Sequence, residues 1–220
     1  MIKREIWDWR KNEKDLWMRP ATHMAYLGQR WISHGLSTVL DLGAGLGRNS
    51  VYLAKQYRLR VTAIDISEYA INFVKQSAIE ENVMVDAVKG DMFNTPFNSS
   101  CFDCVFSYNV TSNLTTKEFE KLLTEINRIV KPGGEIYITL LSKSSAGYKN
   151  ATKENMLDDN TIIVRDENGV EKHEFYVDID DIVKYFSKFE ILDEVVEYNV
   201  YNLQKSDIYS KYFGILVRKR

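Results

Sequence analysis

The sequence VLDLGAGLG at residues 39–47 is an apolar run that leads directly into a glycine-rich turn, followed by a stretch with a helical pattern. Strand, turn and helix in this order are the setting in which a glycine loop binds a nucleotide-like ligand. Glycines let the backbone approach the ligand closely, and the start of the helix presents free amides and a partial positive charge. The stretch therefore predicts a site for a nucleotide-type cofactor.

The spacing of the glycines separates two classes of cofactor. A dinucleotide loop reads GxGxxG, whereas Gly43, Gly45 and Gly47 form GxGxG, and Arg48 stands where the last glycine of a dinucleotide loop would be. Asp41 would repel a pyrophosphate but can accept hydrogen bonds from an ammonium group, such as that of a methionine moiety. Both features favour S-adenosylmethionine over NAD. A nucleotide-binding oxidoreductase is the alternative.

Short β-branched runs alternate with amphipathic helical stretches from residue 37 onward, which is typical of βαβ units around a parallel sheet. An Asn-Gly pair between two later extended runs predicts a β-hairpin, and the last two strands predict an antiparallel pair. We expect strands at 38–42, 60–64, 84–89, 102–107, 134–140, 161–165, 171–177, 189–197 and 212–218, and helices at 116–130 and 179–186.

Acidic residues follow the second and third expected strands. Asp65 comes about 20 residues after the glycine loop, where a carboxylate can receive both ribose hydroxyls; its alternative role is that of a helix N-cap. Ile66 would flank the adenine. Asp91 can accept a hydrogen bond from the adenine amino group, and Met92 and Phe93 can cover the ring face.

The fourth strand ends in Ser107-Tyr108-Asn109, where the reacting end of the ligand is expected in an open α/β sheet. Tyr108 and Asn113 can orient a substrate oxygen or nitrogen, although Asn113 is equally suited to cap the turn before the next helix. His23 and His173 are candidate general bases, because a histidine pKa near 6.5 suits proton removal. The alternative for each is a partly buried, hydrogen-bonded side chain.

The first 35 residues are rich in aromatic side chains and predict a helical cap with a break at Pro20. Trp17, Arg19 and Tyr26 are candidates for closing the pocket over a substrate, with Arg19 pairing with an anionic substrate or with the cofactor carboxylate. Aromatic residues at helical spacing are equally well explained as packing residues of an amphipathic cap.

The composition is that of an ordinary globular domain, with 45% hydrophobic and 27% charged residues in a chain of 220. A net charge of -2 makes a nucleic-acid substrate unlikely. No apolar run has the length of a membrane span or a signal peptide, so we expect a cytoplasmic protein without a membrane partner. Cys101 and Cys104 are two ligands short of a typical metal site, and we expect no metal.

Several motifs occur together in the order found in class I S-adenosylmethionine-dependent methyltransferases, and the chain resembles this family over residues 37–140. The motifs are DLGAGLG (41–47), Asp65, GDM (90–92), FDCVF (102–106) and KPGG (131–134). The resemblance implies an α/β, Rossmann-like, doubly wound sheet of seven mostly parallel strands in the order 3-2-1-4-5-7-6. It also implies that the cofactor lies across the carboxyl ends of the strands. The cofactor-binding residues would be Asp41, Gly43, Ala44, Gly45, Gly47, Asn49, Asp65, Ile66, Asp91, Met92, Phe93, Ser107 and Asn109.

Within the family, the chain is similar to the tellurite-resistance type of small-molecule methyltransferase. The similarity lies in GRNSVYLA (47–54), in the closing YFGILVRKR (212–220) and in Thr22-His23, whereas YNVTSN (108–113) is more polar than this type leads us to expect. The predicted activity is in-line transfer of a methyl group to a small molecule, with S-adenosylhomocysteine as the product. Methylation of a protein or RNA and a non-catalytic cofactor-binding module are the alternatives.

The whole chain is predicted to be one methyltransferase domain that acts as a monomer or homodimer. Its expected parts are a cap at 1–35, a cofactor-binding core at 37–140, a flap insertion at 141–178, and a C-terminal helix with a strand pair at 179–220.

Overall fold

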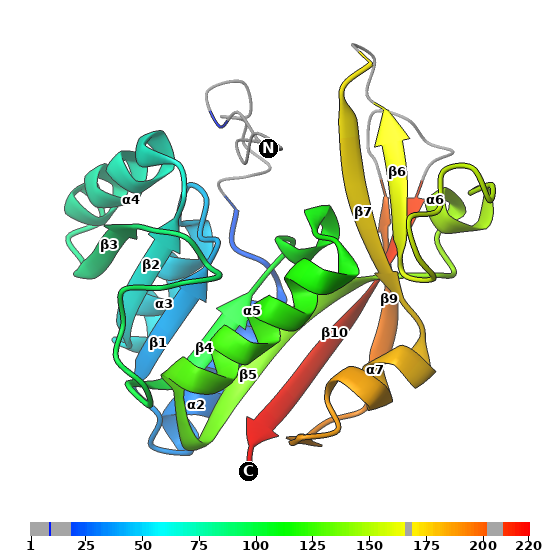
Figure 1. Ribbon diagram of the computed structural model, residues 1–220. Helices are drawn as coiled ribbons and strands as arrows, with labels where there is room; N and C mark the ends of the chain where they lie inside the picture. Colours follow the sequence, from blue (N-terminus) through cyan, green and yellow to red (C-terminus); the bar gives the residue numbers. More distant parts are fainter. Residues whose placement is uncertain (1–8, 10–18, 166–168, 202–208) are drawn as a thin grey trace.

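Strands and helices alternate through the first half of the chain, as the sequence predicts (Figure 1). The computed structural model describes residues 9, 19–165, 169–201 and 209–220. Six of the nine expected strands agree with the observed ones to within two residues at each end, whereas the strands expected at 134–140 and 212–218 begin four and three residues earlier and the strand expected at 189–197 differs in extent. The elements are β1 Thr38–Leu42, α3 Arg48–Tyr57, β2 Arg60–Asp65, α4 Glu68–Glu80, β3 Val85–Lys89, β4 Phe102–Ser107, α5 Thr116–Ile129 and β5 Val130–Ser142.

The strands form one sheet whose main path runs β3-β2-β1-β4-β5-β10-β8. Neighbouring strands from β3 to β5 are parallel, while β10 (Tyr209–Lys219) is antiparallel both to β5 and to β8 (Phe189–Ile191). In order of sequence among these seven strands, the path is 3-2-1-4-5-7-6. The predicted sheet order and the antiparallel end are therefore confirmed.

One predicted strand was wrong in its extent. Residues 189–197 form two strands, β8 and β9 (Val196–Tyr201), that pair with different parts of β10. The exposed, charged Asp193 and Glu194 separate them, and the Tyr26 hydroxyl donates a hydrogen bond to Asp193 at 2.6 Å. The sheet has ten strands in the described residues instead of seven, because β6, β7 and β9 add to the main path.

The predicted hairpin is confirmed as β6 (Thr161–Arg165) paired antiparallel with β7 (Glu171–Val177). It stands beyond the end of β5, next to the short helix α6 (Ala146–Lys149) (Figure 1). β7 also pairs in parallel with the last residues of β5, at Leu141 and Ser142. The hairpin is therefore an extension of the sheet at its carboxyl edge.

The described part of the N-terminal region contains one long helix, α2 (His23–Ser33). Its buried residues Met24, Leu27 and Trp31 pack with α3 on one face of the sheet. The opposite face carries α5 and α7 (Ile179–Tyr185), with Phe119 and Ile182 in the other large core cluster. α5 begins with the predicted Thr115–Glu118 capping box. No described helix is long and apolar enough to cross a membrane.

Candidate active site

The glycine loop between β1 and α3 requires its glycines. Gly43, Gly45 and Gly47 have φ angles of 81°, 53° and 76°, in the left-handed region that side chains with a Cβ rarely adopt. The amide groups of Gly43 and Ala44 both donate to the Ile64 carbonyl, at 2.9 and 3.0 Å. These bonds hold the loop against the end of β2, so the start of α3 faces the carboxyl edge of the sheet.

Asp41 lies beneath this loop at the end of β1 and is only 2% exposed. The Ser50 hydroxyl donates a hydrogen bond to its carboxylate at 2.6 Å. Burial raises the pKa of Asp41 to about 7, and the charge of Asp65 adds to this effect. A buried carboxylate of this kind is stabilised by a bound cation, so the site fits a ligand with an ammonium group.

Asp65 ends β2, and its two carboxylate oxygens accept hydrogen bonds from Gly45 N–H and Ser67 N–H, both at 2.9 Å. The N-cap of α4 is Ser67, whose hydroxyl accepts from the Ala70 amide, so Asp65 does not serve as the cap. Burial raises the pKa of Asp65 despite these bonds. The Asp65 carboxylate therefore connects the glycine loop to the carboxyl end of β2. It also lines a cavity at this edge of the sheet.

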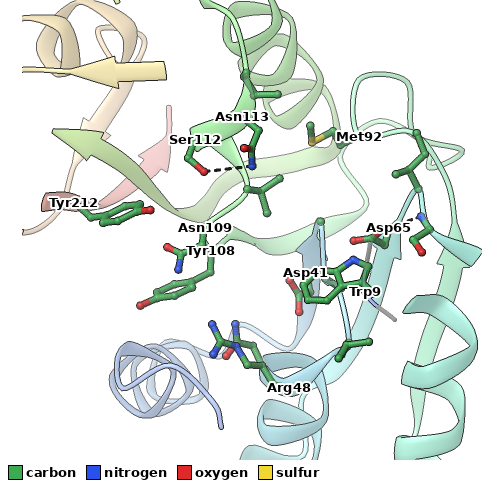
Figure 2. A pocket seen from close by; sticks show the side chains of 18 residues that line it. Trp9, Asp41, Arg48, Asp65, Met92, Tyr108, Asn109, Ser112, Asn113 and Tyr212 are labelled. Atoms are coloured by element: carbon green, nitrogen blue, oxygen red, sulfur yellow. Dashed lines mark hydrogen bonds between the residues drawn. The ribbon is translucent and has the colours of Figure 1, made fainter. Parts of the chain in front are cut away.

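Two adjoining cavities run along the carboxyl edge of the sheet, and they form one cleft because they share seven lining residues, among them Gly43, Asp65 and Asn113. The first has a volume of about 310 Å³; Figure 2 shows Asp41, Asp65 and Trp9 towards one side of it and Tyr108 and Tyr212 towards the other. The second, of about 400 Å³, lies over the ends of β2 and β3.

The cleft brings most of the predicted site residues together. The predicted residues lining the first cavity are Asp41, Gly43, Ala44, Asn49, Asp65, Ile66, Met92, Tyr108, Asn109 and Asn113. Asp91, Phe93 and His173 line the second, together with several of these. Three other predicted residues do not line either cavity. The Gly45 amide donates a hydrogen bond to the Asp65 carboxylate, Gly47 is the N-cap of α3, and the Ser107 hydroxyl donates to the Leu42 carbonyl at 3.1 Å.

Two of the predicted substrate residues of the cap, Arg19 and Tyr26, are not part of the cleft lining. Arg19 is exposed, and its carbonyl accepts a hydrogen bond from Arg48 at 3.1 Å. Tyr26 is exposed and bonded to Asp193, and Trp17 lies outside the described residues. Asn113 borders both cavities, and the following helix has its own cap at Thr115.

The candidate bases occupy different places. His173, on β7, lines the second cavity with Asp91 and Met92. His23, the first residue of α2, has its ring centroid 6.2 Å from that of Tyr108. Burial lowers the pKa of His23, which keeps its imidazole neutral at pH 7. Tyr108 therefore connects His23 with the first cavity.

Eight residues of the first cavity were not among the predicted site residues, and three of them, Arg48, Tyr212 and Trp9, have large side chains with polar groups. The guanidinium of Arg48 lies over the Tyr108 ring at 5.8 Å from the centroid, and Tyr212 enters from β10. The Trp9 indole packs on Gly45 so closely that a Cβ there would overlap it. The glycine spacing drew attention to Arg48, but only the pairing of β10 with β5 brings Tyr212 to the cleft. Within the described residues, no cluster of His, Cys, Asp and Glu could hold a metal ion.

An open α/β sheet with a glycine loop and three carboxylates at successive strand ends defines a nucleotide-type cofactor-binding protein. Residues 40–138 match the family model described as a methyltransferase domain. The chain is 33% identical over 105 residues to a sarcosine/dimethylglycine N-methyltransferase of Halorhodospira halochloris, covering 47% of this chain and 37% of that protein. It is also 33% identical over 104 residues to a norajmaline N-methyltransferase of Rauvolfia serpentina, covering 46% and 34%. The chain thus spans about a third of the length of these relatives.

Solved structures share the fold over most of the chain. An S-adenosylmethionine-dependent methyltransferase from Methanosarcina mazei superposes with a TM-score of 0.72 at 22% identity, covering 86% of this chain and 96% of that one. TehB from Haemophilus influenzae gives 0.66 at 19% identity, covering 89% and 62%. Residues 40–138 therefore match a methyltransferase domain, and the chain as a whole has the fold of S-adenosylmethionine-dependent methyltransferases.

Proposed function

We propose that the protein is an enzyme that transfers a methyl group from S-adenosylmethionine to a small-molecule acceptor. The observation that carries this proposal is the continuous cleft with Asp41, Asp65 and Asp91 at the ends of β1, β2 and β3. A small acceptor is supported by the net charge of -2 and by the relatives, whose names give sarcosine, dimethylglycine and norajmaline as acceptors.

Each carboxylate has a proposed partner on the cofactor. Asp41 would stabilise the ammonium group of the methionine part, and Asp65 would accept hydrogen bonds from the ribose hydroxyls. Asp91 and Met92 would hold the adenine in the second cavity. Since His173 lines that same cavity, we assign the acceptor side to His23 and Tyr108.

The bound cofactor supplies an electrophilic methyl group on a sulfonium. Displacement at such a carbon needs the nucleophile in line with the breaking bond, so alignment and exclusion of water contribute much of the acceleration. Tyr108 and Asn109 lie beyond the end of β4, in the lining of the first cavity. Their position at the cavity supports the proposal that they orient an acceptor. His23, neutral at pH 7, can take the acceptor's proton.

Calorimetric titration tests the cofactor assignment directly. S-adenosylmethionine and S-adenosylhomocysteine are expected to bind, and NADH is not. Asp65→Ala should weaken S-adenosylhomocysteine binding by about 10- to 100-fold, because hydrogen bonds to a charged group contribute about 1.5–3 kcal/mol. Asp86→Ala, which removes an exposed aspartate of β3, is the matched control. The proposal fails if neither adenosyl ligand binds, or if both variants bind like wild type.

The affinity for S-adenosylhomocysteine should depend on pH through Asp41. Its pKa is about 7 in the free protein, and a bound ammonium group lowers it, so binding favours the ionised carboxylate. Affinity should therefore fall as the pH drops through 7, by about tenfold between pH 8 and pH 6. Titrations in one buffer series at constant ionic strength measure this. A flat profile would show that Asp41 does not ionise on binding.

A further inference from the structure

Four aromatic rings from four distant parts of the chain surround one another beside the first cavity. We name His23, Tyr108, Tyr137 and Tyr198 the aromatic cage. The His23 ring centroid lies 5.1 Å from that of Tyr198, 5.7 Å from that of Tyr137 and 6.2 Å from that of Tyr108. These residues come from the start of α2, the end of β4, the middle of β5 and β9. Contacts between residues that are far apart in the sequence therefore form the cage.

The cage contains polar atoms that are buried and have no hydrogen-bond partner among the described residues. They are Nδ1 of His23 and the hydroxyl oxygens of Tyr137 and Tyr198, of which the Tyr198 hydroxyl faces the Tyr108 side chain outside good hydrogen-bond geometry. Tyr137 is only 5% exposed. Leaving a buried polar group without a partner destabilises a protein, so such groups are few and call for an explanation. Three of the four such atoms in the described residues lie in this one cluster, so the cluster has polar groups available to a ligand that enters from the neighbouring cavity.

The surroundings of the cage disfavour charge of either sign. Burial lowers the pKa of His23, and burial raises the pKa values of Tyr137 and Tyr198. A charged ligand would likewise lose its hydration on entering the cage, and this loss disfavours its binding unless the cage supplies an opposite charge. Among the described residues, Arg48 is a cation beside the cage, with its guanidinium over the Tyr108 ring, and its charge interacts with the carboxylate of Asp41. The cage is therefore suited to a neutral ligand.

The cage adjoins the cofactor cleft. Tyr108 belongs both to the cage and to the lining of the first cavity, and Tyr212 lines the same cavity. The rings of Tyr198 and Tyr212 are stacked, with centroids 6.2 Å apart. Flat rings with hydroxyl groups at their edges pack well against a flat aromatic ligand and can also hydrogen-bond to it. A ligand in the cage would thus lie next to the place proposed for the reacting methyl group.

We propose that the aromatic cage binds the methyl acceptor, and that the acceptor is a neutral aromatic molecule whose nucleophile is a phenol-type O–H or a ring N–H. Tyr137 and Tyr198 hydrogen-bond to its polar edge. The acceptor's lone pair forms the bond to the methyl carbon, and the carbon–sulfur bond breaks with its electron pair left on sulfur. The acceptor's proton passes to Nδ1 of His23 and from there to water. This inference rests on the proposed methyltransferase function.

Binding of three probes that share a naphthalene ring tests the selectivity for a neutral ligand. At about pH 7, 2-naphthol is neutral, 2-naphthoate is an anion and 2-naphthylmethylamine is a cation. Equilibrium dialysis against the protein saturated with S-adenosylhomocysteine should show the tightest binding for 2-naphthol. Tyr137→Phe and Tyr198→Phe should each weaken it by about two- to tenfold. The inference is overturned if a charged probe binds as tightly, or if both variants bind 2-naphthol like wild type.

Thermal unfolding of the free protein distinguishes a ligand site from a structural cluster. Tyr137→Phe removes a buried hydroxyl that has no partner, so the melting temperature should rise by roughly 2–4 °C. The matched control is Tyr176→Phe. Tyr176 is also buried, but its hydroxyl donates to Glu174 at 2.5 Å, so this variant should melt at a lower temperature. A fall in both variants would mean that the Tyr137 hydroxyl stabilises the fold and would overturn the inference.

The two proposals fail in different ways. If S-adenosylhomocysteine does not bind to the wild type, the proposed function fails before the probes are used. If it binds, and the naphthyl probes show no preference for the neutral molecule, only the inference about the cage fails. The cage variants should bind S-adenosylhomocysteine with the wild-type affinity, because neither Tyr137 nor Tyr198 lines the cofactor cleft.

Discussion

Replacing Asp41 by Asn is expected to weaken S-adenosylhomocysteine binding by about 30- to 100-fold and, at the same time, to stabilise the free protein. The first effect follows because Asn has no negative charge to stabilise the ligand's ammonium group, and hydrogen bonds between charged groups are the strong ones. The second follows from the burial of the carboxylate, which is 2% exposed in the fold. Asp41 would thus contribute to binding at the expense of stability.

The pH dependence of this stabilisation has a definite sign. In the unfolded chain Asp41 ionises near pH 4, whereas in the fold its pKa is about 7. Between pH 4 and pH 7, Asp41 therefore binds a proton when the chain folds. The free energy of keeping this proton on the buried carboxyl group grows with pH, so Asp41 destabilises the fold increasingly as the pH rises to 7. At pH 8, Asp41→Asn should raise the free energy of unfolding by roughly 2–4 kcal/mol, since one pKa unit corresponds to about 1.4 kcal/mol. Near pH 4 the two proteins should differ little.

Urea denaturation at both pH values, followed by titration with S-adenosylhomocysteine, measures the two effects on the same samples. Asp86→Asn, at an exposed position on β3, should change neither. If Asp41→Asn lowers stability at pH 8 and binds the ligand like wild type, then the carboxylate and its bond from Ser50 serve the fold. The role proposed for Asp41 would then be wrong.

The cofactor side of the cleft was predictable because each of its main residues directly follows a strand that the sequence shows. Asp65 directly follows the expected second strand and Asp91 comes two residues after the third, and the carboxyl ends of parallel strands meet at one edge. No long-range contact is needed to bring such residues together once the sheet order is known. That order was implied by the resemblance of the motifs to those of class I S-adenosylmethionine-dependent methyltransferases.

The acceptor side could not be predicted in the same way. Tyr137 and Tyr212 lie inside strands, where aromatic residues are expected to pack in the core. Tyr198 belongs to β9, which was missed because the sequence 189–197 was interpreted as a single strand. Only the pairing of β9 with β10 places Tyr198 opposite Tyr212. Periodicity within one segment carries no information about which strands become neighbours.

Replacing Arg30 by Met is expected to destabilise the protein by about 3–5 kcal/mol, the usual effect of removing one partner from a buried ion pair. Arg30 extends from α2 and donates two hydrogen bonds to the Glu135 carboxylate on β5, at 2.9 and 3.0 Å. Glu135 is fully buried at 0% exposure. Arg218 approaches the same carboxylate at 3.3 Å, but a single weak contact cannot replace the two bonds from Arg30.

A double-mutant cycle separates the two contributions to this effect. Glu135→Met combined with Arg30→Met removes both charges, so the double variant should regain most of the stability lost in Arg30→Met. Urea denaturation of the wild type, both single variants and the double variant gives the coupling energy. If the double variant is as unstable as the sum of the single variants, the ion pair is not what docks α2 on the sheet. Since His23 begins the same helix, Arg30→Met should also weaken binding of 2-naphthol. The double variant, with α2 docked again, should restore that binding.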